Sequence, residues 1–262
     1  MNYLGPRPAP AIRFIEFMGL PGSGKSTIAA HLESDLRKYG IKIISRSAEF
    51  ADNSHFLWRH YRRFLHVVRN AGRCRRVYFD ALKLITNTRQ KSYWDLAKVT
   101  WNFWSVIAFM ADCRSTRDGL IVIDQGLFQA IWSIQLSASK VLSPAAWNEL
   151  LRTAGITDVL VVNIQSGIPV ARLVARAGKR TRLGSRPHDI HADTWQLAAA
   201  NMAALTNLAY MILPRDQSGD RVITIENDAT CPGEAASEIA AAFLARLKPP
   251  EASGFHDLCS NI

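Results

Sequence analysis

The chain has 262 residues, of which 48% are hydrophobic and 21% charged, and its formal net charge is +10 at neutral pH. These values are ordinary for a globular protein and exclude collagen-like, disulfide-scaffold and low-complexity chains. The most apolar stretch, 99–111, contains Asn102 and is too short to span a bilayer, so we expect no membrane partner. The four cysteines lie far apart and the N-terminus lacks an apolar secretion signal, which favours a reducing, cytoplasmic location.

The positive charge is concentrated in two stretches. Residues 53–79 contain seven arginines and no acid, and residues 172–186 contain six basic residues and no acid. Together the two stretches hold +13, which leaves −3 on the rest of the chain. Concentrated basic charge suits either a nucleic acid or a substrate that carries phosphate groups, and charge alone leaves both open.

Residues 12–33 hold the strongest motif. An apolar run is followed by GLPGSGKST and by apolar residues at helical spacing, which predicts a strand, a glycine-rich turn and a helix. The spacing G-x-x-x-x-G-K-[ST] is that of the Walker A phosphate-binding loop, whose N–H groups favour an anion at a helix N-terminus. A Gly/Ser loop that merely contains a lysine is the weaker alternative. We expect nucleotide contacts from Gly19, Pro21, Gly22, Ser23, Gly24, Lys25, Ser26 and Thr27.

Apolar segments alternate with helical patterns along the rest of the chain. Helical patterning follows the loop to about residue 39, and a second strand is predicted at 41–47. Long helical patterning over 50–116 precedes a third strand at 120–124. The remaining elements, in order, are helices at 126–139 and 143–153, a strand at 158–164, a basic helix and loop from Pro169, a helix at 191–213, a strand at 221–226 and a helix at 232–247.

This alternation indicates an α/β fold with a parallel sheet that is covered on both faces. Side chains that follow the carboxyl ends of such strands face one crevice. Glu49, Asp124 and Asn227 each follow the carboxyl end of a predicted strand, so we expect them to face this crevice. We expect a flexible leader at 1–10, one domain over 11–248 and a disordered tail at 249–262.

Within the long helical stretch, apolar and aromatic residues recur at intervals of three and four. The two sets are Phe56, Leu57, Tyr61, Phe64, Leu65 and Val68, and Trp94, Trp101, Trp104 and Ala108. Such periodicity is typical of helix faces packed in a core, which we favour over a base-stacking platform. The arginines of 59–76 either orient an anionic acceptor or form the solvated side of the helix, and we prefer the second for most of them.

Two acids are candidates for the chemistry. Asp124 ends the apolar strand LIVID, where a carboxylate can hold Mg²⁺ opposite the Ser26 hydroxyl; the alternative is a cap for the next helix. Ser26 and Asp124 are thus the expected metal ligands. Glu49 either accepts a proton from a substrate hydroxyl or is a surface acid at a helix start, and both stay open.

Arg172, Arg176 and Arg180 follow Pro169 at a spacing of four. Guanidinium groups suit the charge on a transferring phosphoryl group, so we expect a lid over 169–190 that closes on the phosphates. The alternative is a solvated helix face.

These motifs resemble a known family. The chain resembles P-loop kinases of the nucleoside and nucleotide monophosphate type, thymidylate-kinase-like in particular. The matching segments are GLPGSGKST at 19–27, LIVIDQG at 120–126 and ARLVARAGKRTR at 171–182. VITIEND at 222–228 matches the family by its position in the chain. The resemblance implies a P-loop NTPase fold with a five-stranded parallel sheet of order 2-3-1-4-5, ATP and Mg²⁺ at the loop, and a helical acceptor lobe over 51–117. By position it implies phosphate and metal contacts from Lys25, Ser26, Thr27 and Asp124, lid arginines at 172 and 176, further nucleotide contacts from Arg180, and Asn227 beside the base.

The expected activity is ATP- and Mg²⁺-dependent transfer of the γ-phosphoryl group to a small acceptor, a nucleoside or a nucleoside monophosphate. Gln125 stands where the family usually has an arginine, and SRSAEF shows no acceptor motif of the family. A kinase of a non-nucleotide alcohol such as a sugar or an antibiotic therefore stays open, as does a nucleic-acid-associated ATPase. Nucleic acid is the less favoured partner, and a homodimer is left open.

Overall fold

The computed structural model describes residues 12–45, 56–116, 118–167, 192–213, 220–227 and 231–247. Several sequence predictions concern residues outside these ranges: Glu49, Arg172, Arg176 and Arg180, the rest of the lid, the leader and the tail.

Five parallel strands form the centre of the molecule. In chain order they are β1 (Phe14–Met18), β2 (Ile43–Ser45), β3 (Leu120–Ile123), β4 (Val159–Gln165) and β5 (Val222–Glu226). Their order in the sheet is β2-β3-β1-β4-β5, with every neighbouring pair parallel. The predicted strand order is confirmed. The strand expected at 41–47 begins two residues later, at Ile43, and residues 46 and 47 lie outside the described ranges.

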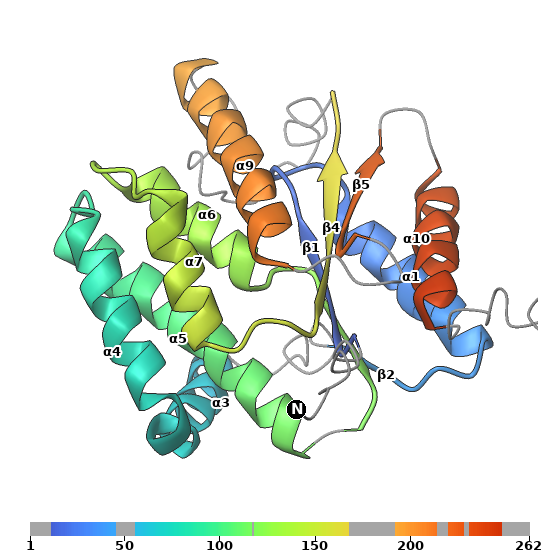
Figure 1. The fold of residues 1–262 in the computed structure, drawn as a ribbon, viewed down its shortest axis with the longest axis horizontal. Helices are drawn as coiled ribbons and strands as arrows, with labels where there is room; N and C mark the ends of the chain where they lie inside the picture. The colour runs from blue at the N-terminus through green and yellow to red at the C-terminus, as the bar shows by residue number, and fades with distance from the viewer. Residues whose placement is uncertain are drawn as a thin grey trace, which may run out of the picture.

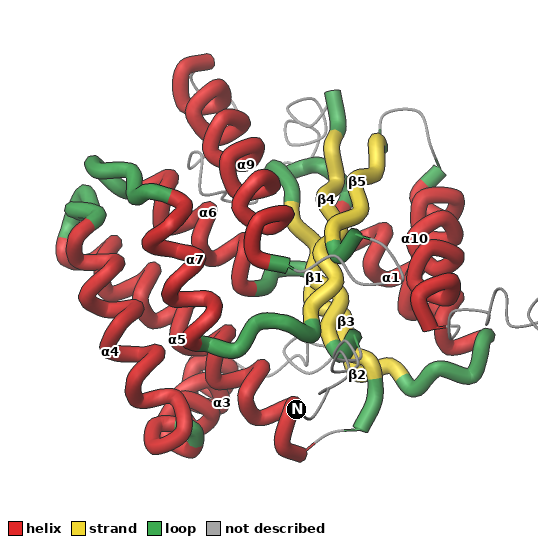
Figure 2. The backbone as a smooth tube through the Cα atoms, in the orientation of Figure 1, coloured by secondary structure: helices red, strands yellow, loops and turns green. Residues whose placement is uncertain are grey.

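Helices cover both faces of this sheet (Figures 1 and 2). On one side lie α1 (Lys25–Lys38) and α10 (Pro232–Leu247). The other side carries the remaining helices of the described chain: α3 (Phe56–Arg69), α4 (Ala71–Asn87), α5 (Tyr93–Thr116), α6 (Leu127–Ser137), α7 (Pro144–Thr153) and α9 (Ala192–Ile212). None of the helices in the described ranges combines the length and apolar character needed to cross a membrane.

Side chains of β1 alternate between two cores, as the strand geometry requires. Ile15 and Phe17 lie in the core shared with α1 and α10, whereas Phe14 and Met18 lie in the core shared with α5 and α6. All five β1 residues are buried. The strand that precedes the glycine loop is therefore held from both faces.

One sequence interpretation is wrong. Tyr61, Phe64, Leu65 and Val68 of α3 were expected to form a core stripe, but they are 48%, 50%, 45% and 52% exposed. Helical periodicity shows which residues share a face, but not what covers that face. The prediction of a core stripe on α5 is confirmed only in part. Ala108 is buried, Trp101 and Trp104 are half-buried, and Trp94 is 77% exposed.

An ion pair fastens the end of α5 to the start of β4. Arg114 donates from Nε to Asp158 Oδ2 at 2.9 Å and from a terminal nitrogen to Oδ1 at 2.5 Å. The same guanidinium lies 5.2 Å from the centroid of the Phe14 ring. Because Asp158 is only 8% exposed, its carboxylate depends on this partner.

Asp158→Asn should lower the free energy of unfolding by about 1–3 kcal/mol, since the variant leaves a half-buried guanidinium without its bidentate partner. The matched control is Asp80→Asn, which removes an exposed pair with Arg76 at 3.8 Å and should cost under about 0.5 kcal/mol. Urea unfolding of both variants checks this, and equal costs would contradict the assignment.

Candidate active site

The segment between β1 and α1 is a tight loop built on glycines. Gly19 and Gly24 have φ values of 147° and 93°, a region that residues with a Cβ rarely adopt. A Cβ on Gly19 would lie 2.4 Å from the backbone oxygen of Ile164 in β4, so the loop can approach that strand only without a side chain. The Ser23 N–H closes the loop by donating to the Leu20 oxygen at 3.2 Å.

Lys25 is the first residue of α1 and is half-buried. Its ammonium donates to the backbone oxygens of Gly19 at 2.7 Å and Leu20 at 2.8 Å, so the charge lies across the loop. Gly24 at the N-cap offers no side-chain acceptor to the N–H groups of the first helical turn. A full positive charge and a helix N-terminus thus meet at one place, and both favour an anion.

Ser26 and Asp124 lie together although they are 98 positions apart. The Ser26 hydroxyl donates to Asp124 Oδ2 at 3.2 Å. Adjacent oxygen ligands of an octahedral Mg²⁺ with bonds of about 2.1 Å are separated by about 3 Å. Hydroxyl and carboxylate oxygens are also the donors that this hard cation prefers. The residues and their spacing therefore fit a magnesium site, to which the remaining ligands would come from phosphate and water.

Asn227 supports the loop. Its side-chain Nδ2 donates to the Ser23 backbone oxygen at 2.7 Å, and its backbone N–H donates to Gln165 at 2.8 Å. The residue is only 2% exposed. The sequence placed Asn227 beside the nucleotide, and the structure brings it to the carbonyl side of the loop, where it fixes the loop against β5.

Glu16 is a buried carboxylate in the middle of β1, with no exposed surface. Its Oε1 accepts the N–H groups of Phe128 at 2.6 Å and Gln129 at 3.2 Å, in the first turn of α6. A carboxylate at a helix N-terminus also interacts favourably with the helix dipole. Gly126 makes room for it, because a Cβ there would lie 2.3 Å from Glu16 Cδ. Glu16 thereby fixes where α6 begins and, with it, the turn that carries Asp124.

Sequence reasoning missed Glu16 and Gly126. The available signal was a single acid inside the apolar run FIEFM, since a buried charge has to find donors. The glycine directly before a helix in DQGLF was the second signal. Neither signal predicts which residue is the partner. Glu16 and Phe128 are 112 positions apart, and their contact depends on the pairing of β1 with β3.

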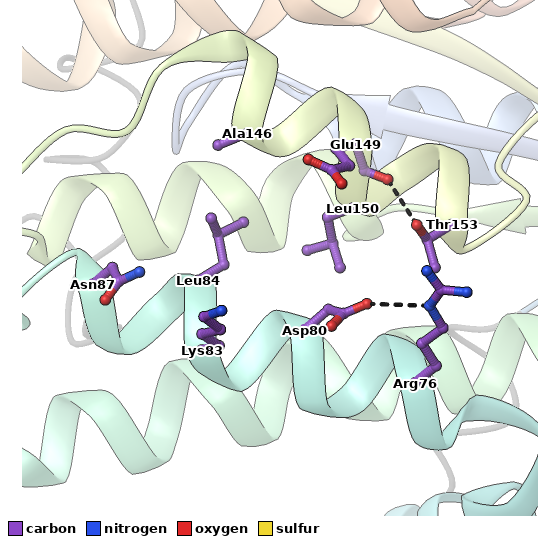
Figure 3. A pocket seen from close by; sticks show the side chains of 9 residues that line it. All are labelled: Arg76, Asp80, Lys83, Leu84, Asn87, Ala146, Glu149, Leu150 and Thr153. Carbon is purple, nitrogen blue, oxygen red and sulfur yellow. Dashed lines mark hydrogen bonds and ion pairs between the residues drawn. The ribbon is translucent and has the colours of Figure 1, made fainter.

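A hollow of about 250 Å³ lies between α4 and α7, away from the loop (Figure 3). Its charged side chains balance: Arg76 and Lys83 come from α4, with Asp80 of α4 and Glu149 of α7 opposite in sign. Figure 3 shows Asp80 turned toward Arg76, 3.8 Å away. A hollow with balanced charge has no preference for a phosphate group.

Comparisons with known proteins give a distant structural likeness. No protein-family model matches the chain, and no curated protein matches it either. Among solved structures, the chain is similar to deoxyadenosine kinase from M. mycoides with dCMP and a flexible dCDP bound, at 13% identity and a TM-score of 0.48, over 88% of this chain and 99% of that one. The structure of the same enzyme with dCTP gives 13% identity and a TM-score of 0.45, over 88% of this chain and 99% of that one. The structure with dATP gives 12% identity and a TM-score of 0.45, over 87% of this chain and 97% of that one.

The likeness is thus to nucleoside kinases, the class that the sequence motifs resemble. At this identity and TM-score it assigns neither an activity nor a substrate to the chain, so a function has to be argued from the chain's own residues.

Gly126→Ala should destabilise the protein by about 1–3 kcal/mol, because its Cβ would overlap the Glu16 carboxyl group. In a Glu16→Ala background the same change should cost much less, since the overlapping atoms are gone. The two sites should therefore show a coupling energy of at least about 1 kcal/mol in a double-mutant cycle measured by urea unfolding. Gly72→Ala, where an added Cβ meets nothing within 4 Å, is the control, and additive costs at 16 and 126 would contradict the contact.

Proposed function

We propose that the chain is a P-loop phosphotransferase that uses ATP and Mg²⁺ to phosphorylate a small acceptor. The observation that carries the proposal is the contact of Ser26 Oγ with Asp124 Oδ2 at 3.2 Å, directly beside the glycine loop and Lys25. A hydroxyl on the first helix and a carboxylate after the neighbouring strand are the two magnesium-holding groups that P-loop enzymes use.

Each described residue has a distinct task in this proposal. Lys25 leaves the carbonyls of Gly19 and Leu20 and pairs with the β- and γ-phosphates, while the loop N–H groups hold their oxygens. Mg²⁺, when held by Ser26 and Asp124, would neutralise charge on the phosphate oxygens. Once the nucleotide is bound, these groups are held in place, so little reorganisation is needed as charge moves onto the leaving phosphate.

Two further residues act through these groups as positioning residues. Asn227 holds the Ser23 carbonyl, so that the loop keeps its curvature. Glu16 holds the first turn of α6 and thereby the turn of Asp124. Neither is proposed to touch the phosphates.

The remaining candidates are proposed on sequence grounds. Glu49 would accept the proton of the acceptor hydroxyl, and Arg172, Arg176 and Arg180 would close over the phosphates as a lid. Gln125, next to Asp124, has an amide and no basic group, so it cannot take a proton from water as a general base. This supports transfer to an acceptor over rapid hydrolysis.

We propose a nucleoside or nucleoside monophosphate as the acceptor, on the resemblance of the three sequence motifs to that class of kinase. The proposed location is the cytoplasm, supported by the reduced thiols of Cys74, Cys113 and Cys231. Burial raises the pKa of the Cys74 thiol, so this cysteine stays protonated and unreactive at neutral pH.

Lys25→Ala should lower the rate of phosphoryl transfer by about a hundredfold or more, since it removes a charge that faces the transferring group. Lys38→Ala, on the last turn of the same helix and exposed, is the matched control and should keep the wild-type rate. ADP release is measured with a panel of nucleosides, nucleoside monophosphates, sugars and aminoglycosides. A Lys25→Ala protein with wild-type turnover would sink the proposal, and turnover that needs an oligonucleotide and no small acceptor would replace it with a nucleic-acid-dependent ATPase.

Asp124→Asn and Ser26→Ala should each raise the Mg²⁺ concentration needed for half-maximal activity, by about tenfold or more. The ATP concentration needed at saturating Mg²⁺ should change less. Asp118→Asn serves as control, because it replaces an exposed aspartate at the opposite end of the same strand. Magnesium titrations of the four proteins check this, and an unchanged magnesium requirement in the Asp124 variant would remove Asp124 from the site.

A further inference from the structure

The outward face of α3 and α4 carries apolar side chains that the described part of the chain leaves partly exposed. On α3, Phe64, Leu65 and Val68 share one helix face and are about half exposed. On α4, Phe79 is 69% and Leu82 is 37% exposed. We call these five residues and the arginines that border them the α3–α4 face. A contiguous apolar patch of this kind on a globular protein usually marks an interaction site.

The opposite side of α3 is the side that holds the helix in place. His66 Nδ1 lies 3.5 Å from Asp112 of α5, and its ring meets Phe109 edge-on. Val67, at 8% exposure, and Asn70, at 5%, are buried on that same side. The apolar stripe is therefore directed away from the core by packing that uses other residues of α3.

Two tryptophans of α5 join the two parts of the face. Trp101 stacks on Phe64 of α3 with the ring centroids 6.4 Å apart, and Trp104 lies 5.2 Å from Tyr78 of α4. Because Trp101 and Trp104 are one helical turn apart, the stripe of α3 and the flank of α4 adjoin. A hollow of about 760 Å³ follows this flank of α4, bounded by Phe79, Leu82 and Trp104.

Arginines border the apolar residues. Arg69, Arg73, Arg75 and Arg76 are all exposed, and residues 61–87 contain seven basic residues and one acid. Arg76 has Asp80 at 3.8 Å, whereas Arg69 and Arg75 have no acidic partner among the described residues. Arg76 also lines the flank of α4 toward α7, where the charge is balanced, so Arg69, Arg73 and Arg75 carry the positive charge of the α3–α4 face.

The charge and the chemistry together select the partner. A second copy of the chain would bring the exposed Arg69, Arg73 and Arg75 of the same face against one another, which is repulsive. A nucleic acid would use the arginines and rings but not the aliphatic Leu65, Val68 and Leu82. An anionic phospholipid surface supplies phosphates for guanidinium groups and an acyl boundary for aliphatic side chains.

We propose that the α3–α4 face is a peripheral docking surface for an anionic phospholipid membrane. We expected no membrane partner from the sequence because no segment can span a bilayer, but docking of this kind requires no span. Figure 1 shows α3 and the start of α4 toward the end of the molecule opposite the glycine loop, so docking leaves the loop accessible.

The test is flotation of the full chain with vesicles of phosphatidylcholine alone and of phosphatidylcholine with phosphatidylglycerol. The chain should bind the anionic vesicles at low salt and bind the neutral ones far more weakly. Arg69→Gln with Arg75→Gln should weaken binding about 25-fold, at about fivefold for each arginine near the surface. Phe64→Ser with Leu65→Ser should abolish the part of the binding that survives high salt.

The matched control is Lys91→Gln with Lys98→Gln, which removes the same charge from exposed positions outside the face and should keep wild-type binding. Circular dichroism and the melting temperature confirm that each variant is folded. The proposal is overturned if the lysine pair and the arginine pair lose the same amount of binding to anionic vesicles. It is overturned as well if the wild-type chain binds neutral and anionic vesicles equally, or binds neither at low salt. It is also overturned if the arginine pair loses binding only to a single-stranded oligonucleotide, which would assign the face to nucleic acid.

Discussion

The pairing of β1 with β3 is the constraint on which the site depends. Glu16 lies opposite Ile123 in that parallel register, so the glycine loop after Met18 and the turn after Ile123 leave the sheet side by side. The contact of Ser26 with Asp124 follows from this register. A slip by one residue would turn every side chain of the strand to the other face and expose Glu16 to the core of α1 and α10. The carboxylate of Glu16, bound to the first turn of α6, holds the register in place.

Much of this arrangement could be predicted because parallel strands buried on both faces are continuous apolar runs. LIVI of β3 and VLVVNIQ of β4 are of this type, and the glycine motif marks the strand before it as β1. The pairing of Ser26 with Asp124 could also be predicted, since both positions follow from the rule that ligands bind at strand carboxyl ends. Glu16 could not be placed in this way. A lone acid in a strand requires donors, but the sequence does not say which amides supply them.

The apolar stripe of α3 shows a second limit of sequence reasoning. Its period correctly predicts a helix with Phe64, Leu65 and Val68 on one face. Whether that face is buried depends on which side of α3 the neighbouring helix takes. Here His66, on the other side, contacts Asp112 of α5, and Asn70 donates to the His66 carbonyl at the end of α3. Together with the buried Val67 they form the inward side of the helix, while the stripe remains about half exposed.

The position of the arginines decides which of the two basic stretches can serve the phosphates. Arg73 donates to the backbone oxygen of Ala111, near the end of α5 that leads into the start of β3. The strand starts form the edge of the sheet opposite the glycine loop, and Figure 1 shows α3 and the start of α4 toward that edge. Positive charge for the transferring phosphate would then have to come from Lys25 and from the stretch at 172–186. Arg69 and Arg75, which have no acidic partner among the described residues, then serve the anionic surface proposed for the α3–α4 face.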